Sequence, residues 1–406
     1  MSEERAEYRP TSSAELEQLV AWAVAEERRI EIAGQGSKRG LGRPVEADIG
    51  LRLDGLSGIL LYEPEELVMS AAAGTPLAEI EAALAERGQE LAFDPADYGA
   101  ICGGPSGLQT IGGVFACNVS GSRRLKAGAA RDHLLGLNCI TGYGQSIKTG
   151  GRVVKNVTGY DLCKLLAGSF GTLAVMDRVT FKVMPKAESE RTLILSGKEE
   201  PELLAILRMA TGTSAEVSGA ACLPMLAAGR SSVRVLVKPA RTVALIRLEG
   251  PRPSVAYRAE QLIRLFPEGV ETKSVDDAES ARLWREVRDV TLLTKQRPLW
   301  RLSLAPTHAA ELVGWLRELT DERIYDWAGG LVWLAMRPDW AESADVIREA
   351  LVGRGGHATL VRGSPELRSR IEVFQPQPEP LRKLSARVKA SFDPKNLLNP
   401  GRMVPA

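Results

Sequence analysis

The first apolar positions along the chain have helical spacing. From Leu16 to Val24 they recur every three or four residues, which places them on one face of a helix. Ser12 and Glu15, just upstream, have the spacing of a capping box, in which both side chains accept hydrogen bonds from backbone N–H groups. The pattern predicts a helix that begins beside Ser12 and buries one face.

Short apolar runs then alternate with glycine-containing turns. Strands are expected at 29–33 and 67–73, followed by a helix that begins at Thr75-Pro76, with Thr75 as its N-cap, and closes at Gly88. Glycine is dense over 103–171. Further strands are expected at 133–141, 151–154 and 171–183.

Beyond residue 186 glycines become sparse, and helical patterns alternate with strand patterns. The alternation predicts a mixed, largely antiparallel sheet with helices on one face, and no internal repeat is recognisable. Helices are expected at 255–266, 278–290, 308–319 and 341–352, and strands at 233–237, 243–248, 299–304, 324–327, 332–336 and 358–361. A proline-rich connector begins at Gln375. The expected domains are therefore 1–185 and 186–374, followed by a C-terminal segment, 375–406.

Composition restricts the classes of function. The 406 residues are 44% hydrophobic and 25% charged, as in globular proteins with a sizeable core. The 52 basic and 51 acidic residues nearly balance, which argues against a nucleic-acid partner. No apolar run is long enough for a membrane span, and the charged N-terminus does not resemble a secretory signal. Five cysteines without a C-x-x-C pair favour a reducing compartment, the cytoplasm.

A glycine-rich loop, Gly34-Gln35-Gly36-Ser37-Lys38, follows the second predicted element. Glycine allows the backbone to turn sharply and to present several N–H groups to an anion, while serine and lysine add a hydroxyl donor and a positive charge. This is the chemistry of a phosphate-binding loop. Taken alone, however, such a loop is more often a plain turn.

Two common nucleotide-binding motifs do not fit this loop. Asp54 lies 20 residues after Gly34, as in a Rossmann fingerprint, but the glycine spacing is one residue too long. Gly40, Gly42 and Pro44 also oppose the helix that should follow. A Walker A loop is excluded because no Gly-Lys-Ser/Thr is present. The loop is therefore a phosphate loop of a third kind.

Further motifs follow this loop in a fixed order. They are Thr110-Ile111-Gly112-Gly113, Asn118-Val119-Ser120-Gly121, Arg131-Asp132 and Gly168-Ser169-Phe170-Gly171-Thr172. Together they resemble the FAD-binding domain of the vanillyl-alcohol oxidase family, also called the PCMH-type domain. Asn399-Pro400-Gly401 resembles a further family signature, in a tail that returns to the flavin domain. The resemblance implies an α+β fold: a PCMH-type FAD-binding domain, then a mixed, largely antiparallel α+β cap domain.

The resemblance also implies roles for individual residues. In that family the first loop holds the pyrophosphate of FAD, the next two loops line the flavin, and the backbone from Gly171 to Val175 lies by the adenine. The implied FAD-binding residues are Gly34, Gln35, Gly36, Ser37, Lys38, Thr110, Ile111, Gly112, Gly113, Asn118, Ser120, Gly121, Arg131, Asp132, Gly171, Val175 and Asn399. Since the first loop contains no histidine or cysteine, non-covalent FAD is expected.

Within that family, the segment 150–162 resembles the glycolate oxidase and D-lactate dehydrogenase branch. The short second half, with Asp326-Trp-Ala-Gly-Gly330, narrows the resemblance to the smaller of the two FAD-binding subunits of bacterial glycolate oxidases. This implies a complex with a larger FAD-binding subunit and an iron–sulfur subunit, and a small 2-hydroxy acid as substrate. Such a complex would lie in the cytoplasm, or at the inner membrane through its partners.

Catalytic residues are less clearly marked. Oxidation of a 2-hydroxy acid needs a base, a hydride acceptor and a cation that holds the carboxylate. Active relatives carry a histidine-rich metal site, whereas this chain has three scattered histidines and no predicted metal site: His133, His308 and His357. Arg301 is a candidate carboxylate anchor or a merely ion-paired arginine. Lys155 and Asn156 are candidates at the flavin edge, or residues that pin their loop.

Three functions remain open from the sequence. The first is a subunit whose flavin takes part in electron transfer while a partner oxidises the acid. The second is a self-sufficient FAD-dependent 2-hydroxy-acid dehydrogenase that uses Arg301 in a metal-free site. The third is a non-catalytic assembly subunit in which FAD is structural. Trp300, Trp327 and Trp333 are expected either in the core or at a subunit interface, and the interface is preferred because aromatic residues are enriched there.

Overall fold

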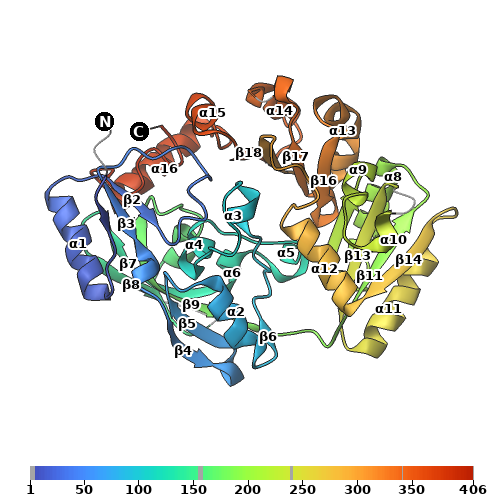
Figure 1. Cartoon of the computed structure of the whole chain (residues 1–406), viewed down its shortest axis with the longest axis horizontal. Coiled ribbons are helices and arrows are strands. Elements are labelled where there is room, and N and C mark those ends of the chain that lie inside the picture. Colours follow the sequence, from blue (N-terminus) through green and yellow to red (C-terminus); the bar gives the residue numbers. More distant parts are fainter. Residues whose placement is uncertain (1–4, 154–158, 238–240, 341, 406) are drawn as a thin grey trace. The chain divides into compact units, whose positions relative to one another are not determined.

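The computed structural model describes residues 5–153, 159–237, 241–340 and 342–405 of the chain. It separates into two compact units (Figure 1). The first unit comprises Met1–Val119, Ala129–Pro185 and Arg368–Ala406, and the second comprises Ser120–Gly128 and Lys186–Leu367. The C-terminal segment thus belongs to the first unit. The short segment Ser120–Gly128, placed in the first domain from the sequence, belongs to the second.

Two main sheets build the first unit. A parallel sheet has the order β1 (Glu7–Tyr8), β3 (Ile49–Arg52) and β2 (Ile30–Ala33). An antiparallel sheet has the order β4 (Ile59–Glu63), β5 (Val68–Ala72), β9 (Ala174–Lys182), β7 (Leu134–Thr141) and β8 (Ser146–Gly150). A short antiparallel pair joins β6 (Gln89–Glu90) and β10 (Met184–Pro185).

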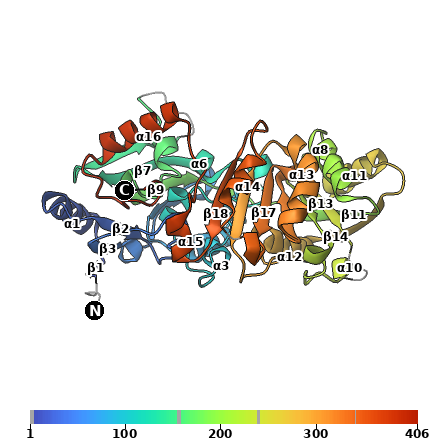
Figure 2. The ribbon, with the colours of Figure 1, turned by 90° about the horizontal axis from the view of Figure 1, so that it is seen from above.

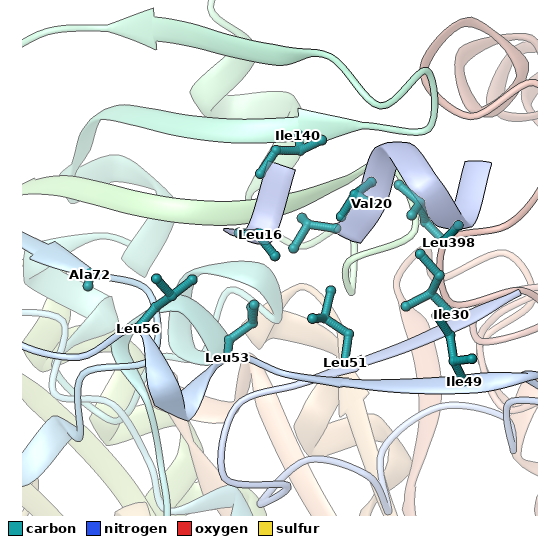
Figure 3. Close-up of a cluster of buried hydrophobic side chains, with 12 residues drawn as sticks. Leu16, Val20, Ile30, Ile49, Leu51, Leu53, Leu56, Ala72, Ile140 and Leu398 are labelled. Atoms are coloured by element: carbon teal, nitrogen blue, oxygen red, sulfur yellow. The ribbon is translucent and has the colours of Figure 1, made fainter. Parts of the chain in front are cut away.

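The predicted first helix is α1 (Ser13–Ala25), and its apolar face enters the core of this unit. The Ser12 side chain accepts a hydrogen bond from the Glu15 N–H, which confirms the predicted cap. Leu16 and Val20 are fully buried in a cluster that Figure 3 shows. The cluster also contains Ile30, Ile49, Leu51, Leu53, Leu56, Ala72, Ile140, Val175 and Leu398. Because Leu398 comes from the C-terminal segment, that segment is part of the core.

The remaining helices of the first unit are mostly short. They are α2 (Leu77–Ala85), α3 (Tyr98–Ile101), α4 (Ile111–Ala116), α6 (Ala130–His133), α7 (Leu162–Leu166) and α16 (Glu379–Phe392), while α15 (Pro365–Arg370) crosses the boundary between units. The predicted N-cap of α2 is wrong: Pro76 occupies that position. The Thr75 hydroxyl instead donates to Ala72 O (2.7 Å) and accepts from Gly58 N (2.9 Å).

An eight-stranded antiparallel sheet forms the second unit. Its order is β14 (Glu271–Asp276), β11 (Ser189–Ser196), β13 (Val243–Gly250), β12 (Gly219–Leu223), β16 (Glu322–Asp326), β17 (Leu331–Ala335), β15 (Leu299–Ser303) and β18 (His357–Arg362). Its helices are α5 (Arg124–Ala127), α8 (Glu200–Thr211), α9 (Met225–Ala228), α10 (Arg234–Val237), α11 (Arg252–Leu265), α12 (Asp277–Arg288), α13 (Pro306–Leu319) and α14 (Ala344–Glu349).

The second unit contains a structural repeat that the sequence does not reveal. The chain order β11-α8-β12-β13-α11-β14 recurs as β15-α13-β16-β17-α14-β18. Each half has the same strand order, and the halves meet where β12 pairs with β16, at Cys222 and Tyr325. The strand predicted at 233–237 is wrong, because Arg234–Val237 is helical. A short apolar run does not by itself distinguish a helix from a strand.

The helices of this unit cover both faces of its sheet, not one as predicted. Tyr325 contacts Glu200 of α8, and Thr192 contacts Trp284 of α12. Through the strand register, Tyr325 shares a face with Cys222, whereas Thr192 shares one with Gly219. Side chains alternate along a strand, so α8 and α12 lie on opposite faces. In Figure 2, α8, α11 and α13 lie on one side of the sheet and α12 on the other.

Candidate cofactor site

A pocket in the first unit is lined by the end of β2, the loop after it, the start of α4 and the C-terminal segment. It brings together ten of the predicted cofactor residues: Gly34, Gln35, Gly36, Ser37, Lys38, Thr110, Gly112, Gly113, Gly171 and Asn399. Motifs more than 350 residues apart in the sequence therefore meet around one cavity.

The glycine-rich loop carries backbone donors that no protein group satisfies. Across the part of the chain that the structure describes, the N–H groups of Gln35, Gly36, Ser37 and Lys38 have no protein acceptor. Gly36 has φ +83°, in the left-handed region that glycine adopts without strain. Successive unpaired N–H groups in a turn form a site for an anion, and a phosphate group fits that requirement.

Lys38 adds a positive charge to the same pocket. Its Nζ lies 3.4 Å from the Ser37 Oγ, and among the described residues it has no carboxylate within ion-pair distance. Desolvation lowers the pKa of the Lys38 ammonium group. A desolvated cation without a counter-charge is unfavourable, and a bound phosphate would supply that charge. The polar end of the pocket therefore fits the pyrophosphate of FAD.

Glycines around the pocket have two different roles: some allow close packing of neighbouring segments, and one leaves space on the pocket side. A Cβ at Gly34 would overlap the Thr110 side chain, and a Cβ at Gly112 would lie 2.7 Å from Ala73 O. Gly34 and Gly112 are therefore required for close packing of the loop, β5 and α4. A Cβ at Gly113 would instead lie 3.7 Å from Lys38 Nζ, on the pocket side.

The C-terminal segment holds the pocket together through Asn399. This side chain is buried, its Oδ1 accepts from Ile32 N (2.8 Å), and its Nδ2 donates to Phe170 O (2.8 Å). Ile32 belongs to β2, and Phe170 belongs to the glycine loop before β9. Asn399 thus joins two walls of the pocket that are distant in sequence.

We expect Asn399→Ala to lower the free energy of unfolding by about 2–4 kcal/mol, because Ile32 N and Phe170 O both lose their partner. The matched control is Asn396→Ala. Asn396 and Asn399 have left-handed φ values of +54° and +42°, but Asn396 is exposed. Backbone strain is therefore introduced by both substitutions, and only Asn399→Ala removes the bridge. Urea unfolding of the two variants measures the difference, and equal midpoints would contradict this role of Asn399.

Two buried arginines near the same segment were missed from the sequence. Arg402 donates to Arg39 O (3.1 Å) and Leu41 O (3.0 Å), and Arg368 donates to Gly42 O (2.9 Å). Both fix the backbone directly after the glycine-rich loop, and Arg402 also lines the pocket. The sequence feature that could have indicated Arg402 is its position directly after the Asn-Pro-Gly motif. Desolvation lowers the pKa of Arg402.

Five predicted cofactor residues of the first unit lie outside the pocket lining. Ile111 is fully buried, and Asn118 Oδ1 accepts from Arg131 N (3.0 Å). Asp132 accepts from Ala129 N (2.9 Å) at the start of α6. The Val175 side chain belongs to the hydrophobic cluster of Figure 3, and its neighbours Ala174 and Met176 line the pocket. A role of these residues in binding FAD stays a prediction.

The other predicted residues lie elsewhere. Ser120 and Gly121 belong to the second unit, where Gly121 O accepts from Trp327 Nε1 (3.1 Å). Lys155 and Asn156 lie outside the described residues. The expectation that three tryptophans form a subunit interface does not hold, because all three are buried in the folded chain: Trp300, Trp327 and Trp333.

The histidines lie in separate environments. His133 is buried and packs against Phe93 with ring centroids 5.2 Å apart. His308 Nδ1 lies 3.2 Å from Glu311 Oε2 on α13, and His357 begins β18. Within the described ranges, no three His, Cys, Asp or Glu side chains are grouped as metal ligands. The predicted absence of a metal stays a prediction.

Among the described helices, none has the length and apolarity needed to cross a membrane.

Comparisons with known proteins identify an FAD-binding family. Residues 5–150 match the model of a family described as FAD binding domain, and residues 377–403 match FAD linked oxidases, C-terminal domain. The chain is 34% identical to glycolate oxidase subunit GlcE of Escherichia coli (strain K12), over 97% of both proteins. It is 26% identical to glycolate oxidase subunit GlcD of Bacillus subtilis (strain 168), over 97% of this chain and 87% of that protein.

Solved structures share the fold. p-Cresol methylhydroxylase with substrate bound matches 98% of this chain and 88% of its own, with a TM-score of 0.73 and 16% identity. An alkyldihydroxyacetonephosphate synthase matches 97% of this chain and 75% of its own, with a TM-score of 0.70 and 14% identity. The expected α+β fold, with a PCMH-type first domain, is thereby confirmed.

Proposed function

This chain belongs to the family of FAD-linked oxidases that includes the glycolate oxidase subunit GlcE, and we propose that it is the FAD-binding subunit of a glycolate-oxidising complex. In this proposal the complex converts glycolate, or a closely related 2-hydroxy acid, to the 2-oxo acid, and electrons pass to partner subunits. The observation that carries it is the pocket of the first unit. Its unpaired N–H groups and Lys38 lie within the segment that matches an FAD-binding family.

FAD supplies the redox chemistry, because a flavin accepts two electrons together with hydrogen from a hydroxy acid. The residues of this chain hold the cofactor. Gln35 to Lys38 would donate to the pyrophosphate, and Lys38 would balance its charge. Ile32, Leu53 and Met176 line the pocket with apolar side chains, which would pack against the rings of FAD and exclude water from them.

The names of the relatives support partner subunits, because GlcE and GlcD are both named as subunits of glycolate oxidase. The family resemblance of the sequence suggests which partners these would be: a larger FAD-binding subunit and an iron–sulfur subunit. The chain offers no clustered metal ligands among its described residues, which supports a partner as the site of acid oxidation. The complex would lie in the cytoplasm or at the inner membrane surface.

An anaerobic absorbance experiment tests the function. The purified chain with its flavin is mixed with glycolate, first alone and then with the larger subunit. A flavin spectrum that bleaches only after the partner is added supports the proposal. Immediate bleaching of the isolated chain favours a self-sufficient dehydrogenase. The supporting observation for that alternative is Arg301, which contacts the Trp327 ring but has no carboxylate partner among the described residues. A flavin that never bleaches, in a complex that still oxidises glycolate, favours the structural role.

We expect FAD to be bound without a covalent bond. The first loop has no cysteine or histidine, but Cys117 lines the pocket, which the sequence did not reveal. Burial raises the pKa of the Cys117 thiol, and a protonated thiol is a poor nucleophile. Acid precipitation should therefore leave all yellow colour in the supernatant. Colour in the pellet that disappears in Cys117→Ala would show attachment at that cysteine.

A further inference from the structure

The parallel sheet of the first unit carries charged side chains on the face that does not enter the core. Ile32 of β2 and Leu51 of β3 contact the hydrophobic cluster of that unit. Successive side chains along a strand point to opposite faces, so Glu31 and Arg52 lie on the other face. Glu7 of β1 lies there as well, with its carboxylate 3.7 Å from the Arg52 guanidinium. Charged groups therefore gather behind the start of the glycine-rich loop.

Arg52 contacts the first peptide unit of this loop. It is the last residue of β3, where it pairs with Ala33 of β2, and its Nε donates to Gly34 O (3.0 Å). A peptide unit is planar and trans, so the Gly34 carbonyl and the Gln35 N–H, which share one unit, point in opposite directions. Arg52 is not among the residues that line the pocket, whereas Gln35 is. By holding the carbonyl behind the loop, Arg52 turns the Gln35 N–H toward the pocket.

A second peptide unit of the loop is oriented without any side chain. Gly36 O accepts from the Arg39 N–H (3.1 Å), a hydrogen bond within the loop's own turn. The Ser37 N–H, in the same peptide unit as Gly36 O, therefore points the other way. The local turn orients this second donor, whereas the orientation of the first depends on a side chain from a neighbouring strand.

Two carboxylates hold Arg52 in place. Its Nη2 donates to Asp54 Oδ2 (2.8 Å), and its Nη1 lies 3.7 Å from Glu7 Oε2. Asp54 Oδ1 is in turn 3.1 Å from Arg9 Nε. The donors of a guanidinium have fixed directions in one plane, so engaging both Nη atoms fixes the direction of Nε toward Gly34 O. Asp54, which lies 20 residues after Gly34, thus acts on the loop through Arg52.

We propose that Arg52, held by Asp54, is a positioning residue for the cofactor: it keeps the Gln35 N–H directed at the pyrophosphate of FAD. A donor that is oriented before the anion arrives avoids the cost of ordering the backbone on binding. Without Arg52, the peptide unit between Gly34 and Gln35 is free to rotate, and that cost is added to binding. This inference rests on the FAD-binding part of the proposed function and not on the substrate.

Titration of the full-length apoprotein with FAD tests this role. Arg52→Ala should weaken FAD binding about 10- to 100-fold, as expected for the loss of one oriented donor to a charged phosphate. The matched control is Arg29→Ala. Arg29 pairs with Asp48 (3.1 Å) just before β2 and β3 begin, at the ends of these strands that lie away from the loop. This control should bind FAD normally, and wild-type affinity in Arg52→Ala would overturn the proposal.

Two further measurements separate orientation of the loop from charge and from general damage. Arg52→Lys keeps the positive charge but lacks the planar set of donors, so it should recover only part of the affinity, and full recovery would refute a role in orientation. ADP carries the pyrophosphate without the flavin, and Arg52→Ala should weaken its binding by the same factor as that of FAD. Undiminished binding of ADP would contradict the assignment to the pyrophosphate.

Asp54→Asn tests the connection between the two side chains, and it also serves if Arg52→Ala yields no folded protein. It should weaken FAD binding, but less than Arg52→Ala does, because it removes only the charge that holds the arginine. In the double variant it should cause no further loss, since Asp54 acts through Arg52. Unchanged affinity in Asp54→Asn, or losses that add in the double variant, would overturn this connection.

These affinities are independent of glycolate oxidation. If Arg52→Ala binds FAD and ADP as the wild type does, the positioning role is refuted and the proposed function stands. If the wild-type flavin is never reduced by glycolate with the partners present, the proposed function fails, while the loss of FAD affinity in Arg52→Ala still supports the positioning role.

Discussion

Gly36→Val is expected to give a folded protein that purifies largely without flavin. Valine disfavours the left-handed conformation that Gly36 adopts, at φ +83°, and relief of this strain turns the neighbouring N–H groups away from the pocket. The loss of two hydrogen bonds to a charged phosphate, at about 1.5–3 kcal/mol each, corresponds to an affinity at least about 100-fold lower. The ratio of flavin to protein absorbance and a titration of the apoprotein with FAD measure the effect.

Gly88→Val is the matched control for this variant. Gly88 also has a left-handed backbone, at φ +62°, with open space where a Cβ would stand, and it lies at the exposed end of α2, outside the pocket lining. It should carry a similar cost in strain and retain flavin. Full FAD content with unchanged affinity in Gly36→Val would contradict the assignment of this loop to the phosphates.

Gly113→Val tests the other side of the pocket by a different mechanism. A Cβ there would lie 3.2 Å from Thr110 Oγ1 and 3.7 Å from Lys38 Nζ, so the added methyl groups would occupy space beside the lysine. The helical backbone at this position tolerates a side chain, and the variant should fold but contain little flavin. Gly314→Val, at an exposed position of α13 with open space around it, supplies the matched helical control.

Chelator-washed protein is expected to contain no stoichiometric metal and to turn over little glycolate alone. A catalytic metal site needs about three protein ligands within coordination distance, usually including histidines. His133, His308 and His357 lie in separate environments, and no such group occurs among the described residues. Without Lewis-acid activation of the hydroxyl group, the rate should be lower by several orders of magnitude than that of a metal-assisted relative.

Elemental analysis combined with a steady-state dye-reduction assay measures both halves of this prediction. The control is the same assay with the larger subunit added, in which turnover should appear. A stoichiometric metal together with rapid turnover by the isolated chain would contradict the accessory role.

The sequence by itself determined the chemistry of the cofactor site. Glycine runs and their order predicted the loops at Gly34 and Thr110, because backbone that must turn sharply or approach a ligand closely requires glycine wherever it lies in the fold. The same local signals predicted α1 and its cap at Ser12. The order of helical and strand patterns along the chain also predicted the α+β class and the largely antiparallel character of the second sheet.

The tertiary structure decided everything that depends on contacts between distant segments. Asn399 joins β2 to the loop at Phe170, and Arg402 fixes the loop carbonyls, because the C-terminal segment packs into the first unit. Cys117 lines the pocket and Val175 lies in the hydrophobic core, and in both cases the orientation of the side chain in the fold decides this. The two-fold repeat of the second unit arises from pairing of strands that are far apart in the chain. Local residue preferences carry no information about such pairing, so only the folded chain revealed the repeat.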